Sequence, residues 1–250
     1  MSNSFEQQVQ RQFTERHTIY DRRSSWIMNP GILDMILAAS RATADAELLD
    51  VCCGTGAVGG AFKGRVRRRV GLDLTQAMLD VAGSRLDEVV QGNALHMPFT
   101  AQRFDLVVSR QALHFFEDPA KVIAEMYRVT KPGGQIILAQ RVPYGNADSE
   151  WMAELNRLKQ PNLKTFMLER HLTDGIERAG FRDLAVTNFG VWESINDWVE
   201  SPEVSSPNRA KILEHCKKAP AQVRAVHPMV VDGDQVRACW RWAFVSAQKP

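Results

Sequence analysis

The most informative run in this chain reads Leu48-Leu49-Asp50-Val51-Cys52-Cys53-Gly54-Thr55-Gly56-Ala57-Val58-Gly59-Gly60. Its apolar first half predicts a buried strand, and the glycines predict a tight turn followed by the start of a helix. Glycine lets the backbone turn sharply and approach a ligand closely, while the N–H groups of the following helix face that ligand. The run therefore predicts a strand–turn–helix unit that carries a binding loop.

The same alternation continues through residues 47–141, where short apolar runs are separated by helical patterns. The expected strands are Glu47–Val51, Arg69–Leu72, Glu88–Val90, Phe104–Ser109 and Gln135–Gln140. Strands separated by helices need crossover connections, and these are right-handed. The pattern predicts an α/β fold, with a doubly wound and mostly parallel sheet covered by helices on both faces.

The segments on either side of this core have a different character. Residues 1–46 are expected to form an N-terminal helical cap, because Phe5, Val9 and Phe13 recur at helical spacing. Residues 142–250 are expected to complete the same domain, with an insertion at about 190–232 that contributes to the substrate pocket. A closing strand is predicted at Val236–Val245, and helices are predicted at Glu150–Leu158 and Leu172–Ala179.

Composition excludes several classes of protein. The 250 residues include 31 basic and 29 acidic side chains, a net charge of +2 that does not steer the molecule toward nucleic acid or a membrane. No apolar run approaches the ~20 residues of a membrane span, and the polar N-terminus does not resemble a secretory signal. The four cysteines lack zinc-site spacing. We therefore expect reduced thiols, a cytoplasmic location and no bound metal.

The glycine loop also constrains the ligand. Gly54, Gly56 and Gly59 satisfy the dinucleotide fingerprint, and Asp73 follows at the separation typical of a ribose-binding carboxylate. Asp50, at the end of the strand, would repel a diphosphate but attract a cation. A ligand with a ribose and a positively charged amino-acid tail fits both carboxylates, and S-adenosylmethionine is such a ligand. An NAD-dependent oxidoreductase is the weaker alternative because of Asp50.

Five ordered motifs within residues 47–141 resemble the class I S-adenosylmethionine-dependent methyltransferases, particularly the group related to the ubiquinone and menaquinone biosynthesis enzymes. The motifs are Leu48–Gly59, Gly71–Leu79, Gln91–Phe99, Phe104–Pro119 and Arg128–Gly134. The resemblance implies a seven-stranded Rossmann-like sheet. It covers about 95 residues and leaves the chain ends without a counterpart.

The resemblance also implies roles for single residues. Asp50 and Gly54 would face the methionine end of the cofactor, Gly56 would make the closest backbone approach, and Asp73 would bind the ribose hydroxyls. Three more residues would surround the adenine, one packing on its face and two reading its edge: Met78, Asn93 and Ala94. The remaining cofactor-binding residues are expected to be Cys52, Leu74 and Arg110.

Two of these positions depart from the family pattern. Cys52 stands where the family usually has glycine, so either the turn is expected to be less permissive or the neighbouring packing is expected to differ. Asn93 replaces the usual aspartate, although its amide oxygen can still accept a hydrogen bond from the adenine amino group.

The candidates for catalysis follow the fourth strand or lie in the cap. His114 is the best-placed general base, since an unperturbed imidazole has a pKa of ~6.5, although it could instead only pack or cap a helix. Tyr20 is expected to end the N-terminal helix, a segment that commonly forms a lid in this family, or merely to anchor that helix. The ends of the fourth and fifth strands contain no acidic residue, so metal-assisted transfer is not expected.

The resulting hypothesis is methyl transfer to O, N or C of a small-molecule metabolite by metal-free in-line displacement. Aromatic residues outside the cofactor core are expected to hold the acceptor: Trp26, Phe115, Phe116, Trp151 and Trp192. One alternative is an RNA or protein methyltransferase, for which the C-terminal lysines (Lys159, Lys164, Lys211, Lys217 and Lys218) would supply a basic surface. Another is a cofactor-binding scaffold that does not methylate, either a rearrangement enzyme or a partner subunit. The basic run 63–69 is interpreted as a solvated loop.

Overall fold

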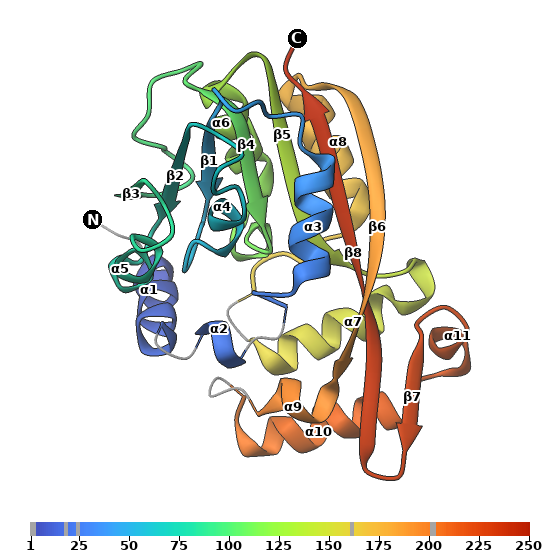
Figure 1. Ribbon diagram of the computed structural model, residues 1–250. Helices are drawn as coiled ribbons and strands as arrows, with labels where there is room; N and C mark the ends of the chain where they lie inside the picture. The colour runs from blue at the N-terminus through green and yellow to red at the C-terminus, as the bar shows by residue number, and fades with distance from the viewer. Residues whose placement is uncertain (1–3, 18–19, 24–25, 161–162, 201–203) are drawn as a thin grey trace.

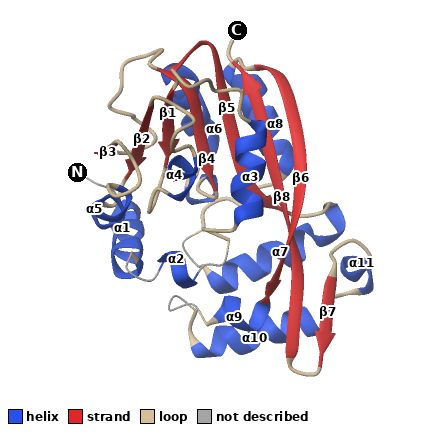
Figure 2. Cartoon of the chain, viewed as in Figure 1, coloured by secondary structure: helices blue, strands red, loops and turns tan. Residues whose placement is uncertain are grey.

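The computed structural model describes residues 4–17, 20–23, 26–160, 163–200 and 204–250. These residues form a central sheet with helices on both faces, and a smaller group of helices lies beyond one end of the sheet (Figures 1 and 2). The strands are β1 (Glu47–Val51), β2 (Arg68–Asp73), β3 (Glu88–Gln91), β4 (Phe104–Arg110), β5 (Thr130–Val142), β6 (Arg182–Ser194), β7 (Met229–Asp232) and β8 (Gln235–Gln248).

The strand order is β3-β2-β1-β4-β5-β8-β6, and β7 pairs with β8 beside this path. The strands from β3 to β5 are parallel to one another, whereas β8 is antiparallel to β5, β6 and β7. This is the predicted doubly wound, mostly parallel sheet. The order reverses at β1, with β2 on one side and β4 on the other, and ligands in such sheets bind beyond the carboxyl ends of the strands at that point.

The helices cover both faces of the sheet or lie beyond its end. They are α1 (Ser4–Arg16), α2 (Tyr20–Arg23), α3 (Pro30–Ala39), α4 (Ala57–Ala61), α5 (Gln76–Ala82), α6 (Pro119–Val129), α7 (Asn146–Lys159), α8 (Glu169–Ala179), α9 (Ile195–Val199), α10 (Ser206–Lys217) and α11 (Ala221–Arg224). Side chains alternate between the two faces along each strand, so Leu48 packs with α3 and α4, and Leu49 packs with α6 and α8. Each face therefore has its own apolar core.

The sheet has eight strands among the described residues, one more than expected. The additional strand β7 pairs with β8 through a two-residue turn in which Gly233 has φ +55°. A positive φ at such a turn suits the right-handed twist of a hairpin, and glycine adopts it without strain. The sequence pattern predicted the turn and the strand after it, but it did not predict β7, which precedes the turn.

The region expected as an insertion contains α9, α10, α11 and β7, which pack with α7 around the long ends of β6 and β8 (Figure 1). The expected end of the N-terminal helix at Tyr20 is wrong. Helix α1 ends at Arg16, and Tyr20 begins the separate short helix α2.

Candidate functional site

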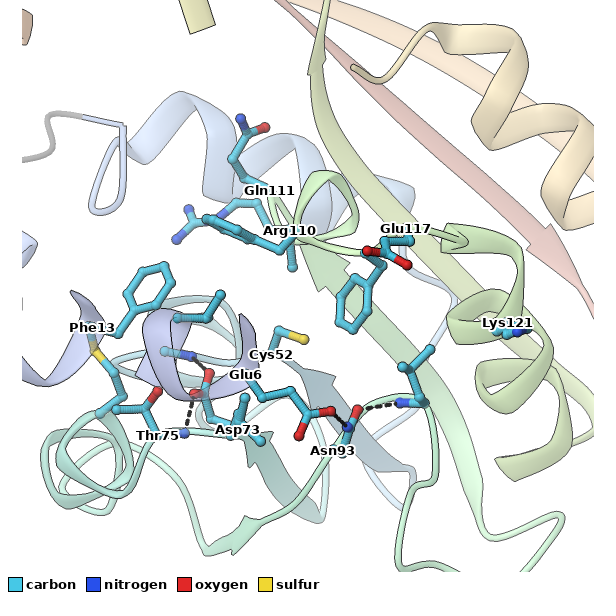
Figure 3. A pocket seen from close by; sticks show the side chains of 18 of the residues that line it. Glu6, Phe13, Cys52, Asp73, Thr75, Asn93, Arg110, Gln111, Glu117 and Lys121 are labelled. Carbon is cyan, nitrogen blue, oxygen red and sulfur yellow. Dashed lines mark hydrogen bonds between the residues drawn. The ribbon is translucent and has the colours of Figure 1, made fainter. Parts of the chain in front are cut away.

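A cavity of about 300 Å³ lies at the carboxyl ends of β1, β2 and β4 (Figure 3). Its floor comes from the turn after β1 and the ends of β2 and β4, and helix α1 covers it. Seven of the ten residues expected to bind the cofactor line this cavity, namely Cys52, Gly54, Asp73, Leu74, Met78, Asn93 and Arg110. The volume lies within the range of small-molecule sites.

Asp73 connects the two loops that border the cavity. Its Oδ2 accepts a hydrogen bond from the Gly54 backbone N–H at 2.8 Å, and its Oδ1 accepts one from the Thr75 N–H at 2.9 Å. Burial raises the pKa of Asp73, while these backbone bonds act in the opposite direction. A carboxylate has about four acceptor positions, so both oxygens can still accept bonds from a ligand.

The turn after β1 is built on three left-handed residues. Cys52 has φ +57°, Gly54 has +52° and Gly56 has +78°. A side chain at positive φ is strained, so the expectation of a less permissive turn at Cys52 agrees with this conformation. Gly56, expected to make the closest backbone approach to the ligand, does not line the cavity. It precedes α4 and faces α5, where a Cβ atom would lie 3.1 Å from the Ala82 Cβ.

Asp50 lies beneath the loop and does not line the cavity, contrary to its expected position at the ligand. Its side chain is 1% exposed, and its Oδ2 accepts a hydrogen bond from the Gly59 N–H at the start of α4 at 2.8 Å. Burial raises the pKa of Asp50 to about 7. The Asp50 carboxyl therefore connects the end of β1 to helix α4. It accepts a hydrogen bond from an N–H group in the first turn of the helix, where such groups have no partner within the helix.

Asn93 connects the loop after β3 to helix α1. Its Oδ1 accepts from the Leu95 N–H at 2.9 Å, and its Nδ2 donates to Glu6 Oε1 at 2.8 Å (Figure 3). Ala94, also expected at the adenine, is buried in the sheet core beside this loop and does not line the cavity. Met78 is fully buried and lines it from helix α5.

Arg110 ends β4 and lies between the cavity and the cap. Its Nη1 donates to the Ile27 carbonyl at 2.8 Å, and its guanidinium lies 5.1 Å from the ring centroid of Trp26. Burial lowers the pKa of Arg110 to about 10, so it stays charged at neutral pH. It is a fixed positive charge near the cavity and near Asp50.

The N-terminal helix covers the cavity through side chains that the sequence predicted only as part of a cap. Glu6, Val9 and Phe13 line the cavity from α1, and Gln10 donates to the Leu74 carbonyl at 2.9 Å. Phe13 packs edge-to-face on Phe115, with ring centroids 5.5 Å apart. The spacing of Val9 and Phe13 was the available signal, but nothing local in the sequence indicates what their helix covers.

The comparisons with known proteins agree with this architecture. Residues 49–138 match the family described as a methyltransferase domain. A Bacillus subtilis protein named uncharacterized methyltransferase YcgJ is 26% identical over 203 residues, which cover 77% of this chain and 79% of that protein. The crystal structure of a Bacillus halodurans protein provisionally named a methyltransferase is 28% identical with a TM-score of 0.80, and the match covers 87% of this chain and 98% of that one. These matches support an S-adenosylmethionine-dependent methyltransferase whose residues 49–138 form the methyltransferase domain.

The resemblance to quinone-biosynthesis enzymes rests on shorter matches. The demethylmenaquinone methyltransferase of Bacillus licheniformis is 34% identical over 149 residues, which cover 55% of this chain and 64% of that relative. The chain therefore spans less than two thirds of the length of this relative.

His114 is not positioned as a base for the methyltransferase. It lies in a 3₁₀ turn (Leu113–Phe115), and its Nδ1 is 3.0 Å from Gln140 Nε2. It is absent from the lining of the main cavity and lines two smaller ones instead. Burial, reinforced by the charge of Arg141, lowers the pKa of His114 to about 3. An imidazole held neutral in this way is a weak proton acceptor, and this placement gives the expected base role no support.

Tyr20, the other candidate for catalysis, lines the main cavity. It also lines a smaller cavity, called the second cavity below, and a Cβ atom on Gly54 would lie 3.8 Å from its ring. Its ring packs edge-to-face with Phe13 at 5.9 Å and with Trp26 at 6.4 Å. Tyr20 thus holds the start of α2 against the cofactor loop.

The aromatic residues expected to hold the acceptor separate into two groups. Phe115 and Phe116 line the main cavity, and Trp26 lines the second. Trp151 instead stacks on His215 in the core, with parallel rings 5.7 Å apart, and Trp192 is 45% exposed on the edge strand β6. The sequence could not separate these groups, since a core tryptophan and a pocket tryptophan have the same local pattern.

Charge on the surface is largely paired. Within the basic run 63–69, Arg67, Arg68 and Arg69 form ion pairs with acidic residues of neighbouring strands and loops. Lys164, Lys217 and Lys218 of the C-terminal part are likewise paired, and Lys159 is buried.

In the described parts of the chain, no group of three or more His, Cys, Asp or Glu side chains could hold a metal ion. Nor does any described helix have the length and apolar character needed to cross a membrane.

Proposed function

We propose that the methyltransferase acts on a small organic molecule bound between the cofactor site and the aromatic side chains of the cap. The observation that supports this most directly is the cover formed by α1. Its contacts through Glu6, Gln10 and Phe13 enclose a cavity in which an RNA or protein acceptor would first have to displace the helix. The paired lysines give a macromolecular acceptor no further support.

S-adenosylmethionine is the methyl donor of this class, and the cavity has groups that fit its parts. Asp73 has acceptor capacity for the ribose hydroxyls, and Gly54 presents backbone without a side chain. Met78 has its buried side chain at the wall where the adenine would lie. Asn93 already uses its Oδ1 on Leu95, so in this role it would read the adenine through the remaining lone pair. When bound, the donor supplies a methyl group activated by the positive sulfur.

The protein's own contribution to such a transfer is position and exclusion of water. An in-line displacement needs the acceptor atom near the methyl carbon and in line with the leaving sulfur, so alignment supplies most of the rate enhancement. Tyr20, Phe13 and Phe115 border both cavities and are the residues that would align an acceptor. The described acidic residues do not cluster as metal ligands, which favours a metal-free reaction. We also propose a cytoplasmic location, because the four cysteines are free thiols.

Product analysis tests this function. The enzyme is incubated with methyl-labelled S-adenosylmethionine and a cell extract, with and without a chelator, and the small-molecule and macromolecular fractions are analysed separately. We expect label in a small molecule that has gained one CH₃, with equimolar S-adenosylhomocysteine and no effect of the chelator. Label confined to RNA or protein, or acceptor conversion without S-adenosylhomocysteine, would favour one of the two alternatives.

Once an acceptor is known, aromatic substitutions localise its site. We expect Trp26→Phe and Phe115→Leu to raise the KM for the acceptor with little effect on S-adenosylhomocysteine affinity. Trp192→Phe is the matched control, because Trp192 is exposed and is absent from the lining of both cavities. If Trp26→Phe and Trp192→Phe changed the KM for the acceptor equally, the acceptor would not bind beside Trp26.

A further inference from the structure

A second, smaller cavity adjoins the cofactor site. Its volume is about 40 Å³, and it shares Phe13, Tyr20, Gln111 and Phe115 with the lining of the main cavity. Gln111 stands at the junction with φ +52°, a strained conformation for a residue with a side chain. Its Oε1 accepts the backbone N–H of Arg141 at 2.8 Å, which fixes β5 at the inner end of the second cavity.

The lining of this second cavity is cationic. Arg16, Arg141 and Lys159 contribute to it, and each is less than 10% exposed. Among the described residues, those that form this wall include no acidic side chain. Because charges attract more strongly where water is excluded, a wall that contains three buried cations favours an anionic occupant.

Of the three cations, Arg141 provides the strongest evidence for an anionic occupant. Its Nη2 is 3.0 Å from Glu193 Oε2, but its Nε is fully buried and has no hydrogen-bond partner. Three tryptophan rings surround the guanidinium, of which Trp240 is closest, with its centroid 4.6 Å away. These rings offset part of the charge but accept no strong hydrogen bond. A guanidinium with one edge unsatisfied is suited to a planar oxyanion.

Lys159 and Arg16 lie on aromatic faces around the same space. The Lys159 Nζ donates to the Trp198 carbonyl at 2.9 Å and lies 3.8 Å from the ring centroid of that residue. The Arg16 guanidinium lies 5.3 Å from the Tyr20 ring centroid. The cavity thus combines positive charge with aromatic surface, and it connects toward the cofactor site through Phe115.

We propose that the methyl acceptor is an organic acid whose carboxylate occupies this second cavity beside Arg141 and whose apolar body extends past Phe115 toward the methyl donor. This inference rests on the proposed function, because it assigns a substrate class to the same site. The cavity is small, about 40 Å³, which favours a compact planar carboxylate over a bulkier tetrahedral phosphate.

Binding measurements test the carboxylate site without requiring turnover. The full-length protein, saturated with S-adenosylhomocysteine, is titrated with benzoate, benzamide and phenyl phosphate, and tryptophan fluorescence is followed. We expect benzoate to bind at least about tenfold more tightly than benzamide, since a charge-assisted hydrogen bond replaces a neutral one. Equal affinity for benzoate and benzamide, or tighter binding of phenyl phosphate, would overturn the assignment.

Variants localise the effect. Lys159→Gln keeps a donor for the Trp198 carbonyl but removes the charge, and R141Q combined with E193Q neutralises the buried pair without leaving either partner charged. Both are expected to weaken benzoate binding about tenfold while keeping S-adenosylhomocysteine affinity, which also verifies that they fold. Lys211→Gln, at an exposed lysine of α10, is the matched control and should bind benzoate normally. Unchanged benzoate affinity in both cavity variants would refute the site.

A turnover assay separates this inference from the proposed function. Hydroxy- and amino-substituted benzoates are compared with their carboxamides as acceptors, by S-adenosylhomocysteine release. Methylation of acids in preference to amides supports both proposals, whereas methylation of both series at equal rates refutes the carboxylate site and leaves the function intact. Charge-selective benzoate binding by a protein that methylates no small molecule would refute the function and leave the anion site intact.

Discussion

The Asn93 amide donates to the Glu6 carboxylate at 2.8 Å, across 87 positions of the sequence, and this bond holds helix α1 over the cofactor cavity. Gln10, one turn further along α1, makes a second bond to the Leu74 carbonyl. The position of Asn93 is one where relatives of the resembled family usually carry aspartate. An aspartate here would face Glu6 at hydrogen-bonding distance, so the asparagine and the covering helix depend on each other.

Asn93→Asp is therefore expected to loosen α1. Replacing the donor by a second carboxylate loses one hydrogen bond and adds like-charge repulsion, roughly 1 kcal/mol or more in total. Hydrogen exchange of the α1 amides should rise about fivefold or more in the absence of ligand. The double variant E6Q/N93D should restore protection, because glutamine can donate to the new carboxylate. Equal exchange in the wild type and Asn93→Asp would show that this bond does not hold the helix.

Asp73→Ala is expected to weaken S-adenosylhomocysteine binding by ~1–3 kcal/mol, the cost of losing charged hydrogen bonds to the ligand. Calorimetry measures this directly. Asp80→Asn, an exposed carboxyl on the neighbouring helix α5, is the control and should leave the affinity unchanged. Because Asp73 also orders the Gly54 and Thr75 N–H groups, melting temperatures of the unliganded variants are needed alongside. Unaltered affinity in Asp73→Ala would contradict the ribose assignment.

The core of the fold was predictable because its strands are short and apolar and its turns contain glycine. β1 is found at Glu47–Val51, as expected, and β2 and β4 differ by one or two residues. The region after Val191 was not predictable in the same way. The helix α10 carries little apolar periodicity, and β7 is only four residues long, so both depend on contacts with α7 and β8.

The direction of a side chain was harder to predict than its position. Asp50 and Asp73 both lie at strand ends, yet only Asp73 borders the cavity, because the Gly59 N–H holds Asp50 beneath the loop. His114 follows β4 as expected but faces Gln140 on the adjacent strand. A sequence motif gives the register of a residue, whereas its partners across the sheet decide where the functional group lies.

Substitutions at Cys52 measure how much the strained turn lowers the free energy of unfolding. At φ +57°, a Cβ costs roughly 1–2 kcal/mol relative to glycine, offset by the ~0.4–1 kcal/mol that glycine adds to the entropy of the unfolded chain. We expect Cys52→Gly to be neutral or stabilising by up to about 1.5 kcal/mol, and Cys52→Val to destabilise by more than about 1 kcal/mol, because branching at Cβ worsens the strain. Denaturant unfolding of both variants measures the contrast. If valine were tolerated as well as glycine, the strain would be negligible.

Asp50 should make stability depend on pH in the direction opposite to a surface carboxylate. Burial raises its folded-state pKa to about 7, above the ordinary value of 3.8, so between these values the folded chain holds a proton that the unfolded chain has lost. The contribution of this group is complete below pH 4 and declines as the pH rises toward 7, by at most about 1.4 kcal/mol per pH unit. Asp50→Asn keeps an acceptor for the Gly59 N–H but cannot ionise. The difference in unfolding free energy between Asp50→Asn and the wild type should therefore increase in favour of the variant from pH 4 to pH 7. Asp34→Asn, at an exposed site on α3, should show no such trend, and a flat difference for Asp50→Asn as well would mean that Asp50 is ionised in the folded protein throughout this range.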